Sequence, residues 1–198
     1  MSAKFSGRAT LLAIFLFLVA VSFGVRTVFH KRRAVYVRDF LEECCKGTEA
    51  LGKLDREPTL LDIADDEGWD CLINASKFNR LDLVKALLLR GASTGGPLMK
   101  HSALRGAALS GYNDVVRALI EAGADVDVFS SHKRTPLMGA AMNGHSTVVK
   151  SLLRAGADTD IKNDDGMTAR DLALRNAHNE IVLMLDRFNN KKKTSAGE

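Results

Sequence analysis

Internal repetition is the feature that most constrains how this chain folds. The stretch "RTPLMGAAMNGHSTVVKSLLRAGADTD", which begins at Arg134, aligns with a stretch that begins at His101, and weaker copies begin at Trp69 and Met167. The equivalent alanines of the four copies are Ala75, Ala107, Ala140 and Ala173. Their spacing of 32 or 33 residues indicates a stack of small supersecondary units.

Each unit is predicted to contain two short helices. In the copy from Arg134, small apolar residues around Ala140 predict the first helix, and Gly144 ends it as a C-terminal glycine. The apolar stripe from Val148 to Leu153 predicts the second helix. One such unit cannot bury its own apolar face, so the units must stack on one another as an all-α solenoid.

The amino-acid sequence of these units resembles that of the ankyrin repeat. Thr135, Pro136 and Leu137 match the turn and helix start of that repeat, and the pair Gly144-His145 matches its Gly-His pair. The resemblance covers about residues 39–190. It implies an ankyrin-repeat solenoid of helix-loop-helix units joined by β-turns, with protein binding as its general role. It also implies that His145 and the equivalent histidine of the last copy, at residue 178, form structural hydrogen bonds.

The repeat period sets the predicted boundaries within the body of the chain. They are a degenerate N-capping repeat over 39–64, ankyrin repeats over 65–96, 97–129 and 130–162, a C-terminal capping repeat over 163–190 and a basic disordered tail over 191–198. In the degenerate copy, Cys44 and Cys45 are interpreted as small buried core residues. Three cysteines with one adjacent pair do not indicate a disulfide framework, and they favour a reducing compartment.

An apolar run without a charged residue, from Ala9 to Val25, precedes the repeats. If Arg26 extends toward the bilayer surface, the run reaches residue 29 and is long enough to span a membrane. We therefore predict a short tail over 1–8, a transmembrane signal-anchor helix over 9–29 and a basic juxtamembrane linker over 30–38. The larger number of basic residues after the run favours repeats that face the cytosol. There are two alternatives to this placement. The anchor lies in a mitochondrial membrane, or the run belongs to a signal or transit peptide that is cleaved.

The charge distribution and the side-chain motifs exclude several classes of function. Residues 1–38 carry seven basic residues and no acid, whereas residues 39–190 carry 18 basic and 23 acidic residues. An acidic body argues against nucleic-acid binding. The segment "GTEALGKL" from Gly47 lacks the Ser or Thr that follows the lysine of a P-loop. The histidines and carboxylates form no catalytic or metal-binding set at a recognisable spacing, so we predict no enzyme, cofactor, metal or small-molecule substrate.

The resemblance also implies where a protein partner binds. Ankyrin-like domains bind through turn tips and the exposed side of their first helices, which together form a concave strip. The matching residues here are Trp69, Lys77, Phe78, Met99, His101, Leu109, Arg134, Met142, Asn143, Met167 and Arg175. Several are aromatic or apolar, as is typical of binding hot spots.

Together these features predict a membrane-tethered adaptor that recruits a protein partner. The alternatives are a non-catalytic structural subunit of a larger membrane complex, and a soluble ankyrin-repeat protein left after cleavage.

Overall fold

The computed structural model describes residues 35–95, 101–130 and 132–195. The chain divides into two compact units, residues 1–39 and 40–198, and the described part of the first unit is helical. The predicted transmembrane segment 9–29 and the tail 1–8 lie outside the described residues. Within those described ranges, no helix is both long and apolar enough to cross a bilayer.

The second unit is built from helices. Residues 40–46 are helical and precede the named elements. In chain order these are η1 (Thr48–Ala50), α2 (Leu51–Arg56), η2 (Pro58–Leu60), α3 (Cys71–Lys77), α4 (Leu81–Leu89), α5 (Ala103–Ser110), α6 (Asn113–Glu121), α7 (Pro136–Met142), α8 (Ser146–Arg154), α9 (Ala169–Arg175) and α10 (Asn179–Ser195). Over the ranges that the structure describes, the only β-structure is an isolated antiparallel bridge between Ala64 and Asp70. The all-α prediction is therefore confirmed.

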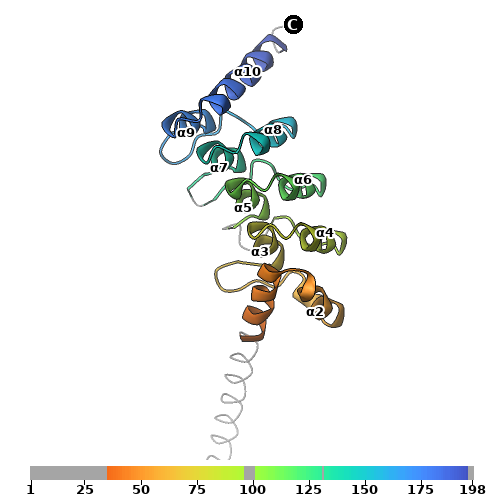
Figure 1. The fold of residues 1–198 in the computed structure, drawn as a ribbon. Coiled ribbons are helices and arrows are strands. Elements are labelled where there is room, and N and C mark those ends of the chain that lie inside the picture. Colours follow the sequence, from red (N-terminus) through yellow and green to blue (C-terminus); the bar gives the residue numbers. More distant parts are fainter. Residues whose placement is uncertain (1–34, 96–100, 131, 196–198) are drawn as a thin grey trace, which may run out of the picture. The chain divides into compact units, whose positions relative to one another are not determined.

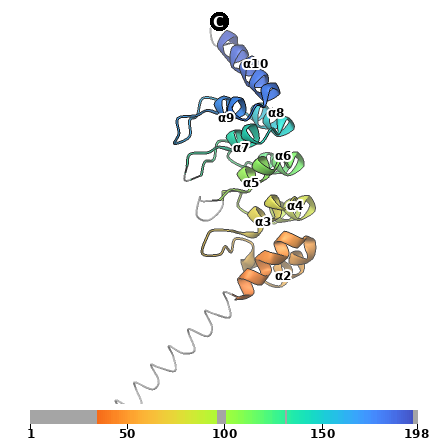
Figure 2. The ribbon, with the colours of Figure 1, turned by 60° about the vertical axis from the view of Figure 1, so that its left-hand side comes forward.

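Four helix pairs stack in two rows. Helices α3, α5, α7 and α9 form the first row, and α4, α6, α8 and α10 form the second (Figure 1). The long connections between pairs project beside the first row (Figure 2). Ala107, Ala140 and Ala173 of the first row are fully buried, and their small side chains allow neighbouring helices to pack closely. The predicted solenoid of helix-loop-helix units is thus the observed fold.

Equivalent residues cap the N-termini of the first-row helices. Asp70, Ser102, Thr135 and Thr168 each accept a hydrogen bond from a backbone N–H three residues further along. Asp70 stands where the usual repeat has threonine, yet its Oδ1 accepts from the Ile73 N–H at 2.7 Å. This weaker copy therefore keeps the same cap with a different side chain, which satisfies the otherwise unpaired N–H.

Histidines connect neighbouring repeats. The Nε2–H of His145 donates to the carbonyl oxygen of Leu109, and that of His178 donates to the carbonyl of Met142, both at 3.1 Å. The His178 ring lies against Gly144, whose φ of 79° is in the left-handed region. The structural role predicted for these two histidines is confirmed, because each one links its own repeat to the preceding one.

Two of the three cysteines form a disulfide, so the prediction that the cysteines do not form a disulfide framework is wrong. Cys44 and Cys71 are bonded with their Cα atoms 5.3 Å apart, while Cys45 is free. Both bonded residues are fully buried, as predicted for Cys44. Adjacent residues on a helix point about 100° apart, so only one cysteine of the adjacent pair faces α3. The spacing along the chain does not reveal this contact, which arises from tertiary packing.

The end of the described chain also differs from the prediction. Helix α10 continues through Ser195, so residues 191–195 of the predicted disordered tail are helical. Lysines have good helix propensity and are favourable near a helix C-terminus, where the helix dipole is negative. These two effects account for the extension of α10 beyond the length of the other second-row helices.

Candidate partner-binding surface

Most of the predicted binding residues occupy two equivalent positions of the repeat. The first position precedes the N-cap of each first-row helix, and we name this series the turn column: Trp69, His101, Arg134 and Met167. The second lies at or next to the end of the same helices, and we name it the helix column: Lys77, Leu109, Met142 and Arg175. Phe78 and Asn143 directly follow helix-column residues, and Met99 lies outside the described residues.

Four of these residues meet in one cluster. The rings of Trp69 and His101 stack with centroids 3.9 Å apart and planes inclined by 20°. The Lys77 Nζ lies 4.4 Å from the Trp69 ring centroid and 5.8 Å from that of Phe78. The indole N–H of Trp69 donates to Glu67 at 3.3 Å. These contacts hold the indole of Trp69 in one orientation.

The two columns also meet at the other end of the stack. A guanidinium nitrogen of Arg175 lies 3.9 Å from the Met167 sulfur. This contact joins the same two repeat positions as the contact between Lys77 and Trp69. Asn143 has a structural role in addition to its predicted one. Its side-chain N–H donates to the Leu109 carbonyl at 2.7 Å and so connects two repeats.

Comparison with known proteins identifies the repeats themselves. A family model described as "Ankyrin repeats (3 copies)" matches residues 42–130 and 104–194. The chain belongs to the ankyrin repeat family. A search of curated proteins finds no match. Ankyrin repeats are protein–protein interaction modules, so protein binding is the general role of this ankyrin unit.

The first-row helices of the ankyrin unit carry more positive than negative charge. Helices α3, α5 and α7 contain no acidic residue, and the Asp171 carboxylate of α9 is used in capping that helix. Lys77 and Arg175 end two of these helices, and Arg105 lies on a third. The surface between the columns therefore combines aromatic and thioether side chains with cations.

Sequence reasoning missed Arg105. This residue stands at the repeat position that Ile73 and Met138 occupy as buried apolar side chains. Burial, and secondarily the nearby Arg134, lower the pKa of Arg105. Burial, followed by the charge of Arg105, lowers the pKa of His101, which keeps that imidazole neutral near pH 7. A charged residue at an apolar repeat position was the signal that could have identified Arg105.

The segment resembling a P-loop has a different environment. Gly47 follows the helical residues 40–46, and the segment from Thr48 to Leu54 forms η1 and part of α2. The Lys53 Nζ forms an ion pair with Glu43 at 2.7 Å. A P-loop requires a strand before its glycine-rich turn, so this segment does not have that architecture. Among the described residues, no three His, Cys, Asp or Glu side chains are grouped so as to hold a metal ion.

Proposed function

We propose that this ankyrin-repeat chain is a membrane-tethered adaptor that recruits a protein partner through the turn and helix columns. The observation that carries the proposal is the cluster around Trp69, where His101 and Lys77 hold the indole in place. Phe78, which is 45% exposed, extends the aromatic surface at the edge of this cluster. Rigid, partly exposed aromatic residues beside cations are common hot spots in protein interfaces.

The tether rests on the apolar run from Ala9 to Val25 and on the basic residues that follow it. A single anchor confines the ankyrin unit to a membrane surface, which raises its effective concentration toward any partner at the same membrane. The greater number of basic residues on the C-terminal side of the run favours repeats that face the cytosol. The mechanism is recognition combined with localisation and needs no chemical step.

The partner surface is tested by proximity labelling in cells with the full-length chain. Trp69→Ala combined with Phe78→Ala should abolish labelling of the partner, because both anchoring rings are removed. Leu89→Ala is the matched control, since Leu89 is 89% exposed but lies on α4 in the other row. Circular dichroism must show an unchanged fold for both variants. Equal partner labelling by wild type and by the double variant would reject the assigned surface.

The tether is tested separately by carbonate extraction of membranes. The full-length chain should stay in the pellet, and a chain that lacks residues 9–25 should move to the supernatant. Recovery of the full-length chain in the supernatant would contradict the tether but would leave the partner surface intact.

A second candidate places the same adaptor in an oxidising compartment, either facing a lumen or released by cleavage. The disulfide between Cys44 and Cys71 favours this placement, because structural disulfides persist in oxidising compartments and are rare in the cytosol. Cells can be quenched in acid, denatured and treated with a polymer-linked maleimide. One modified thiol per chain, on Cys45, supports the oxidising compartment, whereas three modified thiols support the cytosol.

A further inference from the structure

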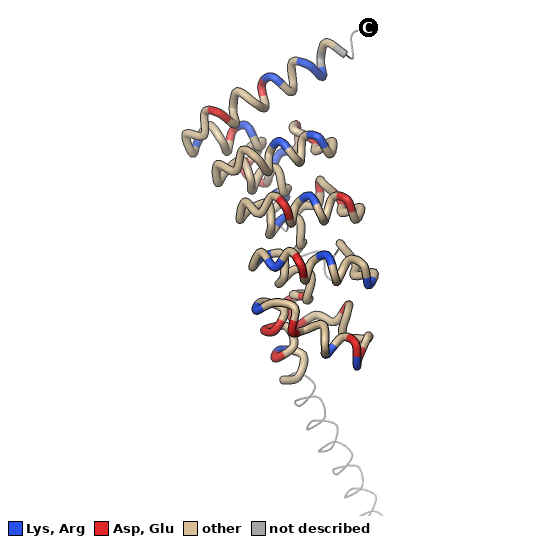
Figure 3. Tube along the Cα trace, turned by 45° about the vertical axis from the view of Figure 1, so that its right-hand side comes forward, with Lys and Arg blue, Asp and Glu red and all other residues tan. Residues whose placement is uncertain are grey.

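A groove lies on the second-row side of the ankyrin unit, between α8 and α10. Helix α10 has 17 residues whereas α8 has 9, and the two helices diverge along the C-terminal half of α10 (Figures 1 and 3). The resulting space has a volume of about 230 Å³, and we name it the wedge. Its apolar lining consists of Leu153 from α8 and of Met184 and Phe188 from α10. Leu153 is buried, and the other two are half-buried.

Cations surround this apolar lining. The remaining residues of the wedge are Lys150, Arg154, Arg187 and Lys191. None of these four forms an ion pair with another residue in the part of the chain that the structure describes. Helix α8 carries no acid, and Figure 3 shows basic positions on both helices. The wedge therefore combines an apolar centre with a wholly positive border.

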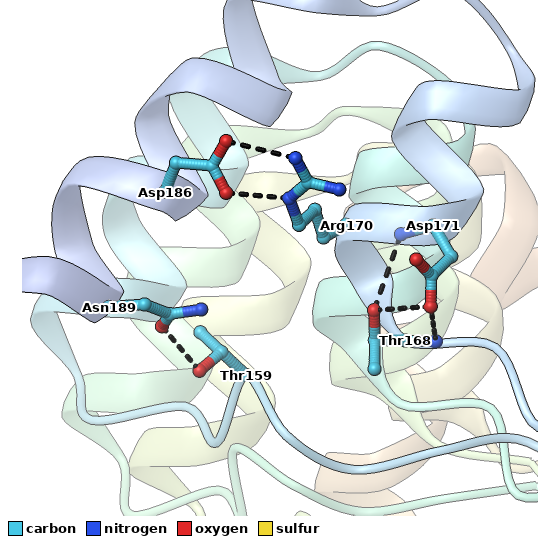
Figure 4. A network of polar contacts seen from close by, with 6 residues as sticks. All are labelled: Thr159, Thr168, Arg170, Asp171, Asp186 and Asn189. Atoms are coloured by element: carbon cyan, nitrogen blue, oxygen red, sulfur yellow. Dashed lines mark hydrogen bonds and ion pairs between the residues drawn. The ribbon is translucent and has the colours of Figure 1, made fainter.

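The one acid in this part of α10 is neutralised elsewhere. The Arg170 guanidinium donates to both carboxylate oxygens of Asp186, at 2.6 and 3.1 Å (Figure 4). The Thr159 hydroxyl donates to the Asn189 side chain at 2.7 Å, which fixes α10 to the loop after α8. Helix α10 is thus held in its diverging position by contacts of its own, so the wedge is formed before a ligand binds.

We propose that the wedge binds an acidic amphipathic helix of a partner protein. A helix with one apolar stripe between acidic residues matches a groove between two helices that has an apolar centre and a cationic border. The N-terminal segment of this chain does not match, because residues 1–34 carry six basic residues and no acid. A flat bilayer surface matches less well, since Met184 and Phe188 lie between the helices and are only half exposed. The proposal does not depend on the partner of the turn and helix columns.

The test selects ligands from a phage-displayed library of amphipathic helices, with the full-length chain in detergent micelles as the target. The positions beside the apolar stripe of each helix encode Glu, Asp, Lys or Gln. We expect the selected helices to be acidic and their affinity to fall as the salt concentration rises. A double charge reversal, Arg154→Glu with Arg187→Glu, should weaken binding at least about tenfold. Two cations at the border of the wedge then become negative charges, which repel an acidic helix.

Three further variants assign the effect to the wedge. Lys85→Glu is the charge-reversal control outside the wedge, because Lys85 is exposed on α4 of the same row, and it should leave affinity unchanged. Phe188→Ala should weaken binding by removing part of the apolar lining, with an unchanged circular dichroism spectrum. The double variant Trp69→Ala with Phe78→Ala should bind as wild type, which separates this site from the columns.

Four results would overturn the proposal. They are the selection of no helix, the selection of helices without acidic enrichment, full affinity in the double charge reversal, and equal weakening by the Lys85→Glu control. Dioctanoyl phosphatidylserine serves as a lipid probe below its micelle concentration. If this lipid binds, the double charge reversal abolishes its binding and no acidic helix is selected, the wedge is a site for anionic lipid instead.

Discussion

The contact between Gly144 and His178 allows a stability prediction with a matched control. Gly144 has φ 79°, and a Cβ atom there would lie 2.7 Å from the Cε1 atom of the His178 ring. Gly156 has nearly the same backbone, with φ 89°, but a Cβ at that position would meet nothing within 4 Å. Gly156→Ala therefore measures the cost of backbone strain alone, and Gly144→Ala measures that cost together with the loss of the His178 contact.

The magnitudes follow from these two environments. Left-handed backbone costs a residue with a Cβ about 1 to 2 kcal/mol, and this is the whole expected loss for Gly156→Ala. Gly144→Ala also displaces the His178 ring, which removes the hydrogen bond to the Met142 carbonyl at a cost of about 1 kcal/mol. Forcing a side chain into a packed site adds about 1 to 2 kcal/mol. We therefore expect Gly144→Ala to lower the free energy of unfolding by about 3 to 5 kcal/mol.

The assay is urea unfolding followed by circular dichroism, with all variants measured at one pH. A double-mutant cycle with His178→Ala isolates the contact. In that background the additional effect of Gly144→Ala should fall to the value found for Gly156→Ala, since the ring is gone. Equal losses for the two glycine variants in the wild-type background would refute the argument. So would an unchanged effect of Gly144→Ala when His178 is absent.

Three other predictions concern the disulfide, a buried carboxyl and a cap. Reduction, or Cys71→Ser, should lower the free energy of unfolding by about 3.5 kcal/mol for a 27-residue separation, and urea unfolding with and without reductant measures this loss. Burial raises the pKa of Asp70 from 3.8 to about 6. The contribution of this carboxyl group to the free energy of unfolding is therefore fully present below pH 3.8 and is lost as pH rises through 6. That change amounts to up to about 3 kcal/mol, and Asp70→Asn should remove it from unfolding curves recorded between pH 4 and pH 7. Thr168→Ala should reduce stability by about 1 to 2 kcal/mol in the same assay, whereas Thr168→Ser should retain the cap.

Much of this fold could be predicted because the repeat encodes local interactions at fixed spacing. The caps, the glycines that end helices and the bridging histidines recur every 32 or 33 residues, so one well-matched copy predicts the others. Asp70 departs from the threonine of the usual repeat, and only the structure shows that its side chain caps the helix in the same way. The positions of the residues in the turn and helix columns follow from the same repeat spacing.

Features that depend on packing outside the repeat could not be predicted in this way. The bond between Cys44 and Cys71 joins the irregular first segment to a repeat, and the repeat pattern is weakest there. The wedge depends on the direction that α10 takes after the last regular turn, and no neighbouring repeat constrains this direction. Arg105 was detectable in principle, but its significance depends on the depth of its burial and on its proximity to Arg134.

The disulfide has a mechanical consequence for a chain that is held at its N-terminus. Tension applied there passes along the helical residues to Cys44 and then crosses the sulfur–sulfur bond to Cys71 at the start of α3. The 27-residue interval between the two cysteines carries no load while this bond is intact. Reduction would therefore release about 90 Å of additional extensible chain between the anchor point and the first regular repeat.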